Sequence, residues 1–237
     1  MPRFFTDPIE GDLALIQGED AAHISRSLRL KPGEAITLCD GSGWDYEGVI
    51  LSTGETVTVS IEQKIPSSTE PRVKITLFQA MPKGDKMETI IQKAVELGAT
   101  EIVPILTDRC ISRPDSKSMA KKIQRYQKIA LEAAKQSGRG VIPQIRPLCT
   151  LQQAVEQLPE TSLVFYEKGG ARLCELLDGK EERIGLFVGS EGGFAPEEIQ
   201  FLTQHGVQAA TLGSRILRCE TAPLCGISVV LSLTGDI

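Results

Sequence analysis

The chain of 237 residues has few aromatic side chains and almost no histidine. Aromatic residues make up 5% of it, with one Trp and two His. So few rings argue against a long stacking platform for single-stranded nucleic acid. His-centred nucleophilic catalysis is also disfavoured, because neither His23 nor His205 lies in a recognisable motif. If the partner is a nucleic acid, we expect recognition of its shape, with one base turned out of its stack.

The cysteines are too scattered for a metal site. No Cys-x-x-Cys pair occurs, and a zinc site needs tighter clustering. The pattern favours buried free thiols in a reducing compartment. No apolar run approaches the roughly 20 residues that span a bilayer, and the N-terminus does not resemble a signal peptide. We therefore expect a cytoplasmic protein without metal or membrane contact. The six cysteines are Cys39, Cys110, Cys149, Cys174, Cys219 and Cys225.

Charge is unevenly distributed, although the net charge is only −5. Residues 1–70 carry 5 Lys+Arg and 12 Asp+Glu, residues 71–150 carry 15 and 7, and residues 151–237 carry 6 and 12. The formal charges of the three parts are therefore −7, +8 and −6. A solvated helix face explains part of the positive middle, because lysines are frequent from Lys117 to Lys135. The segment still favours a surface that binds the phosphates of a nucleic acid.

Residues 1–65 are predicted to form short strands joined by turns. Turn signals at 31–33, 40–43 and 53–54 separate short apolar runs. Closely spaced short strands are typical of a small β-barrel. A helix is expected over Ala21–Leu30, and Pro66–Pro71 has the composition of a linker. The strands are expected at Leu13–Ile16, Ala35–Cys39, Trp44–Leu51 and Thr56–Glu62.

From Val73 onward, strand-length apolar runs alternate with helical segments. Asp85 and Glu88 have the spacing of a capping box, and Gly98 follows the end of the same helix. Alternation of strands and helices indicates a mainly parallel sheet covered on both faces. The helices are expected at Asp85–Leu97, Asp115–Ser137 and Pro196–His205. The strands are expected at Val73–Gln79, Glu101–Leu106, Ser162–Tyr166, Ile184–Val188 and Gln208–Leu212.

Two of these strands end in glycine and charge, within Leu186–Phe194 and Thr211–Ala222. Ligands of open α/β sheets bind just beyond the carboxyl ends of the strands. Glycine lets the backbone approach a ligand closely and allows positive φ. Arg215, Arg218 and Glu220 add charge that a purely structural turn would not need. The two ends are therefore predicted to line one pocket.

Five motifs, taken in order along the chain, carry a family resemblance. They are Pro2-Arg-Phe-Phe5, Gln79–Met87 followed by Ile91–Gly98, Glu132–Arg139, Gly189–Phe194, and Leu212–Arg218 with Glu220–Ala222. Together they resemble the bacterial 16S rRNA uridine-N3 methyltransferases (RsmE-type) of the SPOUT superfamily. The resemblance covers nearly the whole chain, and the set is far more specific than any one motif.

The resemblance implies an α/β protein with two domains. Residues 1–70 would form a PUA-like β-barrel that binds RNA. Residues 71–237 would form a SPOUT methyltransferase domain with a deep C-terminal trefoil knot, whereas pattern alone would predict an unknotted sheet. It also implies S-adenosylmethionine as the methyl donor, a homodimer, and the 16S rRNA of the small ribosomal subunit as substrate and partner.

The resemblance assigns the cofactor to the two glycine-containing strand ends. Arg218 is the candidate that stabilises a uracil anion, and Glu220 or Glu191 the candidate that accepts the N3 proton. A structural Arg–Glu pair across the turn is the alternative for Arg218 and Glu220. The expected cofactor-binding residues are Val188, Gly189, Glu191, Gly192, Gly193, Leu212, Gly213, Arg215, Ile216, Leu217, Arg218, Thr221 and Ala222.

Basic residues are the candidates for RNA contacts, since positive side chains position a protein on the phosphate backbone. They are Arg3, Arg26, Arg29, Lys83, Lys86, Arg109, Arg113 and Arg139. Two other functions stay open: another SPOUT RNA methyltransferase that acts on the ribose 2′-O, and a ribosome-binding module without turnover.

Two positions depart from the family's usual motifs. Ser190 stands where the glycine loop usually has proline, and Cys219 where the later motif usually has threonine. Proline pre-sets φ, so Ser190 is expected to lower the rigidity of the loop. A thiol is a weaker hydrogen-bonding group than a hydroxyl, so Cys219 is expected to affect affinity more than activity.

Overall fold

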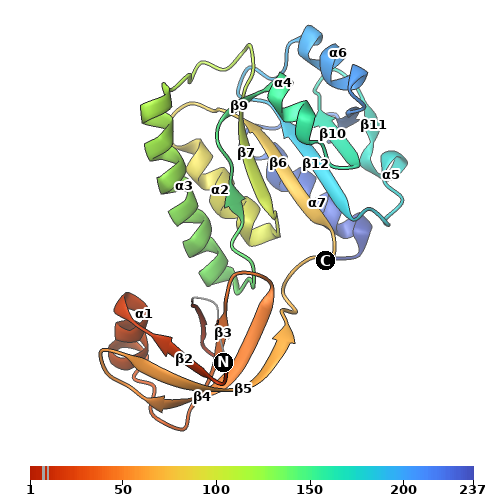
Figure 1. The fold of residues 1–237 in the computed structure, drawn as a ribbon. Coiled ribbons are helices and arrows are strands. Elements are labelled where there is room, and N and C mark those ends of the chain that lie inside the picture. Colours follow the sequence, from red (N-terminus) through yellow and green to blue (C-terminus); the bar gives the residue numbers. More distant parts are fainter. Residues whose placement is uncertain (7–8, 10) are drawn as a thin grey trace. The chain divides into compact units, whose positions relative to one another are not determined.

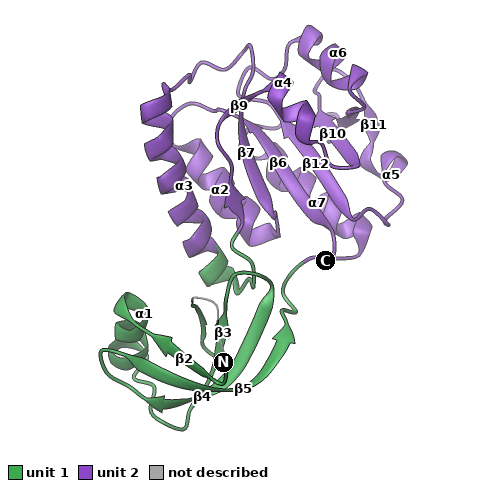
Figure 2. Cartoon of the chain, in the orientation of Figure 1, with its two compact units in different colours: residues 1–70, 134–142 green, residues 71–133, 143–237 purple. Residues whose placement is uncertain are grey.

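The chain leaves its N-terminal part and later returns to it. The computed structural model describes residues 1–6, 9 and 11–237, and these fall into two units (Figure 2). The first unit joins Met1–Glu70 to Ala134–Ile142, and the second joins Pro71–Ala133 to Pro143–Ile237. Residues 134–142 thus belong to the N-terminal unit by their contacts, although they follow a segment of the second unit in sequence.

A curled five-stranded sheet forms the first unit (Figure 1). The strands lie in the order β1-β3-β4-β5-β2; β1 runs parallel to β3, and the other pairs are antiparallel. The sheet is a half-barrel, as the short strands predicted, and Ile36, Leu38 and Val59 are fully buried in its core. Its strands are β1 Arg3–Phe5, β2 Leu13–Ile16, β3 Ala35–Cys39, β4 Trp44–Ser52 and β5 Val57–Pro66.

The predicted helix over Ala21–Leu30 was placed too late in the sequence. The structure has α1 at Gly18–Ala22, which continues as a π-helix over His23–Ser27. Arg29 lies outside the helix with a φ of 54°, in the left-handed region. The amide of Leu30 donates to the carbonyl of Ile24, so the chain turns back here. Arg29 therefore does not share a helix face with Arg26.

Buried charge joins residues 134–142 to the rest of the first unit. The side chains of Arg139 and Glu70 are 3% and 9% exposed, and their closest N and O atoms are 2.5 Å apart. The amides of Gly140 and Val141 also donate to Glu70, over 2.9 and 3.1 Å. Arg3 donates to the carbonyl of Gly138 and pairs with Asp45. Carboxylates that accept several hydrogen bonds can remain charged when buried.

An eight-stranded sheet, in which every pairing is parallel, lies at the centre of the second unit (Figure 1). The order is β11-β13-β10-β12-β6-β7-β8, and β9 also pairs with β7. The predicted parallel sheet is confirmed. The strands are β6 Lys74–Ala80, β7 Glu101–Leu106, β8 Gln144–Ile145, β9 Cys149–Thr150, β10 Thr161–Phe165, β11 Ala171–Arg172, β12 Arg183–Val188 and β13 Gln208–Thr211.

The three predicted helices are present, within one residue of their predicted ends. Some details of the helices differ from the prediction. Asp85 precedes α2 without a side-chain capping bond, because the amide of Glu88 donates to the carbonyl of Asp85 over 3.0 Å. The Glu88 carboxylate pairs with Arg125 at 2.7 Å. The short helices α4 and α5, of four residues each, were missed, and so was α7, because its apolar residues do not form one periodic stripe. The helices are α2 Lys86–Leu97, α3 Ser116–Ser137, α4 Leu151–Ala154, the 3₁₀ turn Val155–Gln157, α5 Leu173–Leu176, α6 Pro196–Gln204 and α7 Ala222–Thr234.

Removing one member of the Arg139–Glu70 pair should destabilise the protein. In Arg139→Met the Glu70 carboxylate stays buried without its cation, and breaking a buried pair in this way costs about 3–5 kcal/mol. The free energy of unfolding, measured in urea, checks this. The control Lys180→Met removes a pair with Asp178 that is 86% and 69% exposed, and should change the free energy by less than about 0.5 kcal/mol. Equal losses in both variants would contradict the expectation.

Candidate active site

A pocket of about 450 Å³ lies at the carboxyl ends of three neighbouring strands, β13, β10 and β12. Its wall is made by the segment after β10, the glycine loop Gly189–Gly193 after β12, and the loop Thr211–Ala222 after β13, which we call the second loop. The pocket lies at the strand ends predicted from the sequence, because parallel strands all direct their carboxyl ends to one edge of the sheet.

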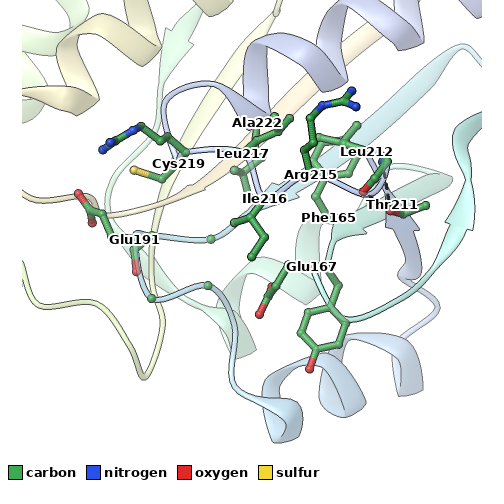
Figure 3. Close-up of a pocket in the computed structure, with 18 of the residues that line it drawn as sticks. Phe165, Glu167, Glu191, Thr211, Leu212, Arg215, Ile216, Leu217, Cys219 and Ala222 are labelled. Carbon is green, nitrogen blue, oxygen red and sulfur yellow. Dashed lines mark hydrogen bonds between the residues drawn. The ribbon is translucent and has the colours of Figure 1, made fainter.

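Figure 3 shows how the two sides of the pocket differ. Glu191 and Cys219 lie on one side, while Leu212 and Arg215 lie on the other. Ile216 lies between them, and its side chain is 84% exposed. An apolar side chain this exposed beside a pocket has surface to bury against a ligand.

The glycine loop is a tight turn that excludes larger side chains. The amide of Gly193 donates to the carbonyl of Ser190 over 2.9 Å, and Gly193 has a φ of +65°. A Cβ at Gly189 would lie only 2.9 Å from the Cα of Gly193. Because the neighbouring atom is backbone, it cannot move away without distorting the turn. The glycines are therefore required by the shape of the loop.

Two other strand ends hold the glycine loop in place. Gln79, which is fully buried at the end of β6, donates to the carbonyl of Gly189 over 3.3 Å. Arg109, which follows β7, donates to the carbonyl of Gly192 over 2.9 Å. The hydroxyl of Ser190 donates in turn to the carbonyl of Arg109, over 3.4 Å. These bonds supply rigidity that the loop lacks through having Ser190 in place of proline.

Charged groups from three segments meet at one side of the pocket. The ammonium of Lys86 lies 2.9 Å from a carboxylate oxygen of Glu191 and 3.3 Å from one of Glu220. The thiol of Cys219 donates to Glu220 over 3.2 Å. Glu220 pairs with Lys86, and the alternative of a structural pair between Arg218 and Glu220 is not what the structure has. We call Lys86, Glu191 and Glu220 the charge cluster.

These contacts change the acidity of each group. The hydrogen bond with Glu191 raises the pKa of Lys86. Burial would raise the pKa of Glu191 and of Glu220, but hydrogen bonds, including those from Lys86, hold both below their usual range. Burial, followed by the bond to Glu220, raises the pKa of Cys219 to about 12. Around neutral pH the charge cluster therefore consists of one cation and two anions, and the Cys219 thiol beside it is neutral.

Of the predicted cofactor-binding residues, all but Thr221 line the pocket. Thr221 instead directly precedes α7 as its N-cap. Arg215 and Arg218 are both exposed at the pocket, and the carbonyl of Arg218 accepts the amides of Thr221 and Ala222. The lining residues that the sequence did not assign to the cofactor are Lys86, Phe165, Tyr166, Glu167, Ser190, Thr211 and Cys219.

A signal for some of the missed residues was present in the sequence. Phe165 and Tyr166 end the predicted strand Ser162–Tyr166, and Glu167 follows it. The rule that ligands lie at the carboxyl ends of strands applies to this strand as well. The ring of Phe165 also contacts Gly226 of α7, where a Cβ would overlap it. Lys86 had no comparable local signal, because its carboxylate partners are distant in sequence.

The predicted RNA-binding residues do not form a single group. Lys86 lies in the pocket, and Lys83 and Arg109 lie beside the glycine loop, since the backbone amide of Lys83 donates to Glu191. Arg113 donates to the carbonyl of Thr107 over 2.7 Å and so holds the segment after β7. In the first unit, Arg26 and Arg29 are exposed, whereas Arg3 and Arg139 are engaged in ion pairs. Because Arg139 is buried, the structure does not present its side chain to a phosphate.

Neither a metal centre nor a membrane span is evident in the part of the chain that the structure describes. No three His, Cys, Asp or Glu side chains among residues 1–6, 9 and 11–237 are grouped so that they could hold a metal ion. None of the helices formed by these residues combines the length and the apolar character that crossing a bilayer requires.

Comparison with known proteins agrees with this geometry. An RNA methyltransferase domain matches residues 69–231, and a PUA domain of RNA methyltransferases matches residues 16–62. The ribosomal RNA small subunit methyltransferase E of Bacillus subtilis is 31% identical over 225 residues, which cover 91% of this chain and 88% of that protein. The chain belongs to the ribosomal RNA small subunit methyltransferase E family. The family resemblance read from the motifs is thereby confirmed.

The solved structures that resemble this chain include two that contain a bound cofactor. The ribosomal RNA small subunit methyltransferase E of Neisseria gonorrhoeae, bound to S-adenosylmethionine, is 33% identical with a TM-score of 0.87, and the match covers 98% of both chains. A methyltransferase from Legionella pneumophila in complex with the same cofactor is 32% identical with a TM-score of 0.83, covering 97% of this chain and 96% of that one.

The raised pKa of Cys219 predicts that its thiol resists alkylation. At pH 8, four units below a pKa of about 12, roughly one thiol in ten thousand is the reactive thiolate. Iodoacetamide should therefore label the exposed Cys174 and leave Cys219 unlabelled, as peptide mass spectrometry would show. If Cys219 were labelled as fast as Cys174, its pKa would not be raised in this way.

Proposed function

We propose that this protein transfers a methyl group from S-adenosylmethionine to N3 of one uridine in the 16S rRNA of the small ribosomal subunit. The observation that supports it most is the pocket lined by both glycine-containing strand ends, in a chain whose relatives share the name of a small-subunit rRNA methyltransferase. The cofactor is supported by two similar structures that contain it.

The pocket suits this cofactor in size and in chemistry. A volume of about 450 Å³ lies within the usual range of roughly 300–1,000 Å³ for small-molecule sites. Gly189 and Gly193 keep the wall free of side chains, and Ile216 offers apolar surface. Glu167 and Glu191 line the pocket with carboxylates, which complement a positively charged ligand. When bound, the cofactor supplies a methyl group attached to a cationic sulfur.

The exposed Arg218 is assigned to the negative charge that develops on the uracil. The acceptor nitrogen loses a proton and gains a methyl group, so the ring is anionic before the new bond forms. A guanidinium offers several fixed donors for the ring oxygens. Because Glu220 pairs with Lys86, it does not occupy this guanidinium in the structure. Arg218 is therefore available to a substrate.

Glu220 and Glu191 are assigned to the proton that leaves N3. Both carboxylates are ionised near neutral pH, as a proton acceptor must be. Their lowered pKa values make them weak bases, so each would act by orienting the reacting groups as much as by taking up the proton. Positioning of the two reactants would then supply much of the rate.

RNA contacts are assigned to the exposed basic residues. Arg26 and Arg29 belong to the PUA-like unit, and Lys83 and Arg109 lie beside the glycine loop. The helix α3 adds exposed lysines, since Lys121 and Lys128 lie two turns apart on it. The homodimer and the trefoil knot stay predictions of the family resemblance.

A substitution at Gly189 tests the cofactor assignment. Gly189→Ala adds a Cβ 2.9 Å from the backbone of Gly193, and the distorted loop should bind S-adenosylmethionine at least about tenfold more weakly. Isothermal titration calorimetry measures the dissociation constant. In the control Gly54→Ala the nearest atom to the new Cβ is 3.9 Å away, so its affinity should equal that of the wild type. An unchanged constant in Gly189→Ala would remove the glycine loop from the binding site.

Methyl transfer to small ribosomal subunits that lack the modification tests the reaction itself. With labelled S-adenosylmethionine, the nucleoside analysis should give labelled 3-methyluridine at a single site. A labelled 2′-O-methylated nucleoside would instead support the ribose-modifying alternative. Unlabelled subunits together with cofactor binding would redirect the test to free or precursor rRNA. If the protein bound no cofactor, it would be a ribosome-binding module without turnover.

A further inference from the structure

The position of Lys86 is not explained by the helix to which it belongs. Lys86 is the first residue of α2, where the helix dipole presents partial positive charge and disfavours a cation. When a residue is unfavourable at its position in a helix and no neighbouring residue compensates, contacts with other parts of the structure are expected to explain it. For Lys86 these contacts are with the carboxylates of Glu191 and Glu220, which lie outside α2.

The ammonium of Lys86 contacts both loops that form the pocket. Its bond to Glu191 reaches the glycine loop, and its bond to Glu220 reaches the second loop. Glu191 is held a second time, by the amide of Lys83 over 3.2 Å. Glu220 is held a second time by the thiol of Cys219. One cation thus contacts both anions. The other contact of Glu191 is with Lys83, three residues before Lys86, whereas the other contact of Glu220 lies within the second loop.

Without this cation, two negative charges would face each other across the gap between the loops. Like charges at such short range repel, and water screens them only in part because all three side chains are about one-third exposed or less, at 33%, 31% and 27%. The two loops would then separate. The wall of the pocket that contains Glu191 and Cys219 would move with them.

We propose that Lys86 is a positioning residue, whose ammonium joins the glycine loop to the second loop and so shapes the pocket before the cofactor enters. The inference rests on the proposed function only for the identity of the ligand. A site that is already arranged binds more tightly, because no free energy is spent on ordering it. Lys86 therefore acts on affinity for the cofactor through the two loops.

Hydrogen exchange tests the connection without any ligand. In Lys86→Met, the backbone amides of residues 189–194 and of residues 212–222 should both exchange faster than in the wild type. The matched control is Lys93→Met, which removes a lysine on the same helix and breaks its pair with Glu96. It should leave both segments unchanged. Unaltered exchange in Lys86→Met, or equal acceleration in both variants, would overturn the proposal.

Calorimetry with S-adenosylmethionine tests the consequence for binding. Lys86→Met should weaken binding by about tenfold, and Lys86→Arg should restore most of it, because a guanidinium can also bridge two carboxylates. In the double variant Lys86→Met with Glu191→Gln, the loss of binding free energy should be smaller than the sum of the losses in the two single variants. The reason is that both substitutions remove the same Lys86–Glu191 pair. Full affinity in Lys86→Met, or strict additivity, would contradict the connection.

Different results would contradict the proposed function and the proposed role of Lys86. If wild-type protein bound no S-adenosylmethionine, the proposed function would be wrong, and hydrogen exchange would still decide whether Lys86 joins the loops. If the wild type methylated rRNA and Lys86→Met lost turnover with an unchanged Michaelis constant for the cofactor, Lys86 would act in the chemical step. That result would overturn its assignment as a positioning residue.

Discussion

The parallel direction of the strands in the second unit is the constraint on which the site depends. Because β10, β12 and β13 are neighbours that run the same way, the segments after them emerge at one edge of the sheet. Loops that are far apart in sequence therefore share one pocket. The adjacent strands β6 and β7 contribute from the same edge, through Gln79 and Arg109, and fix the backbone of the glycine loop.

The ion pair of Arg139 and the two ion pairs of Lys86 show how burial decides what a charge contact does. The Arg139–Glu70 pair is almost completely buried, so loss of either partner leaves a costly unpaired charge and the pair matters for stability. The contacts of Lys86 are partly exposed, and ion pairs in such places contribute little to stability. Their value lies in where they hold the loops. Similar chemistry thus supports the fold in the first unit and the arrangement of the site in the second.

The spacing of apolar residues predicted the secondary structure well where one face of a helix or strand is buried. The strands Ala35–Cys39 and Glu101–Leu106 and the amphipathic helix α3 follow directly from their apolar spacing. Pattern failed for α7, which lacks a periodic polar face, and for the end of the first helix, where Arg29 takes a left-handed conformation. The helix α7 packs against α2 and β12, and at Arg29 the bond from the Leu30 amide to the Ile24 carbonyl turns the chain back. A periodicity argument contains neither contact.

The sequence by itself determined the family, the alternation of strands and helices, and the two glycine-containing strand ends of the site. Each of these depends on neighbouring residues or on motifs that remain together in the chain. Tertiary structure alone decided that Lys86 lies between Glu191 and Glu220 and that Arg139 is buried against Glu70. These contacts join residues that are far apart in the chain. Their distances are set by how the sheet and helices pack, and the order of the residues does not specify them.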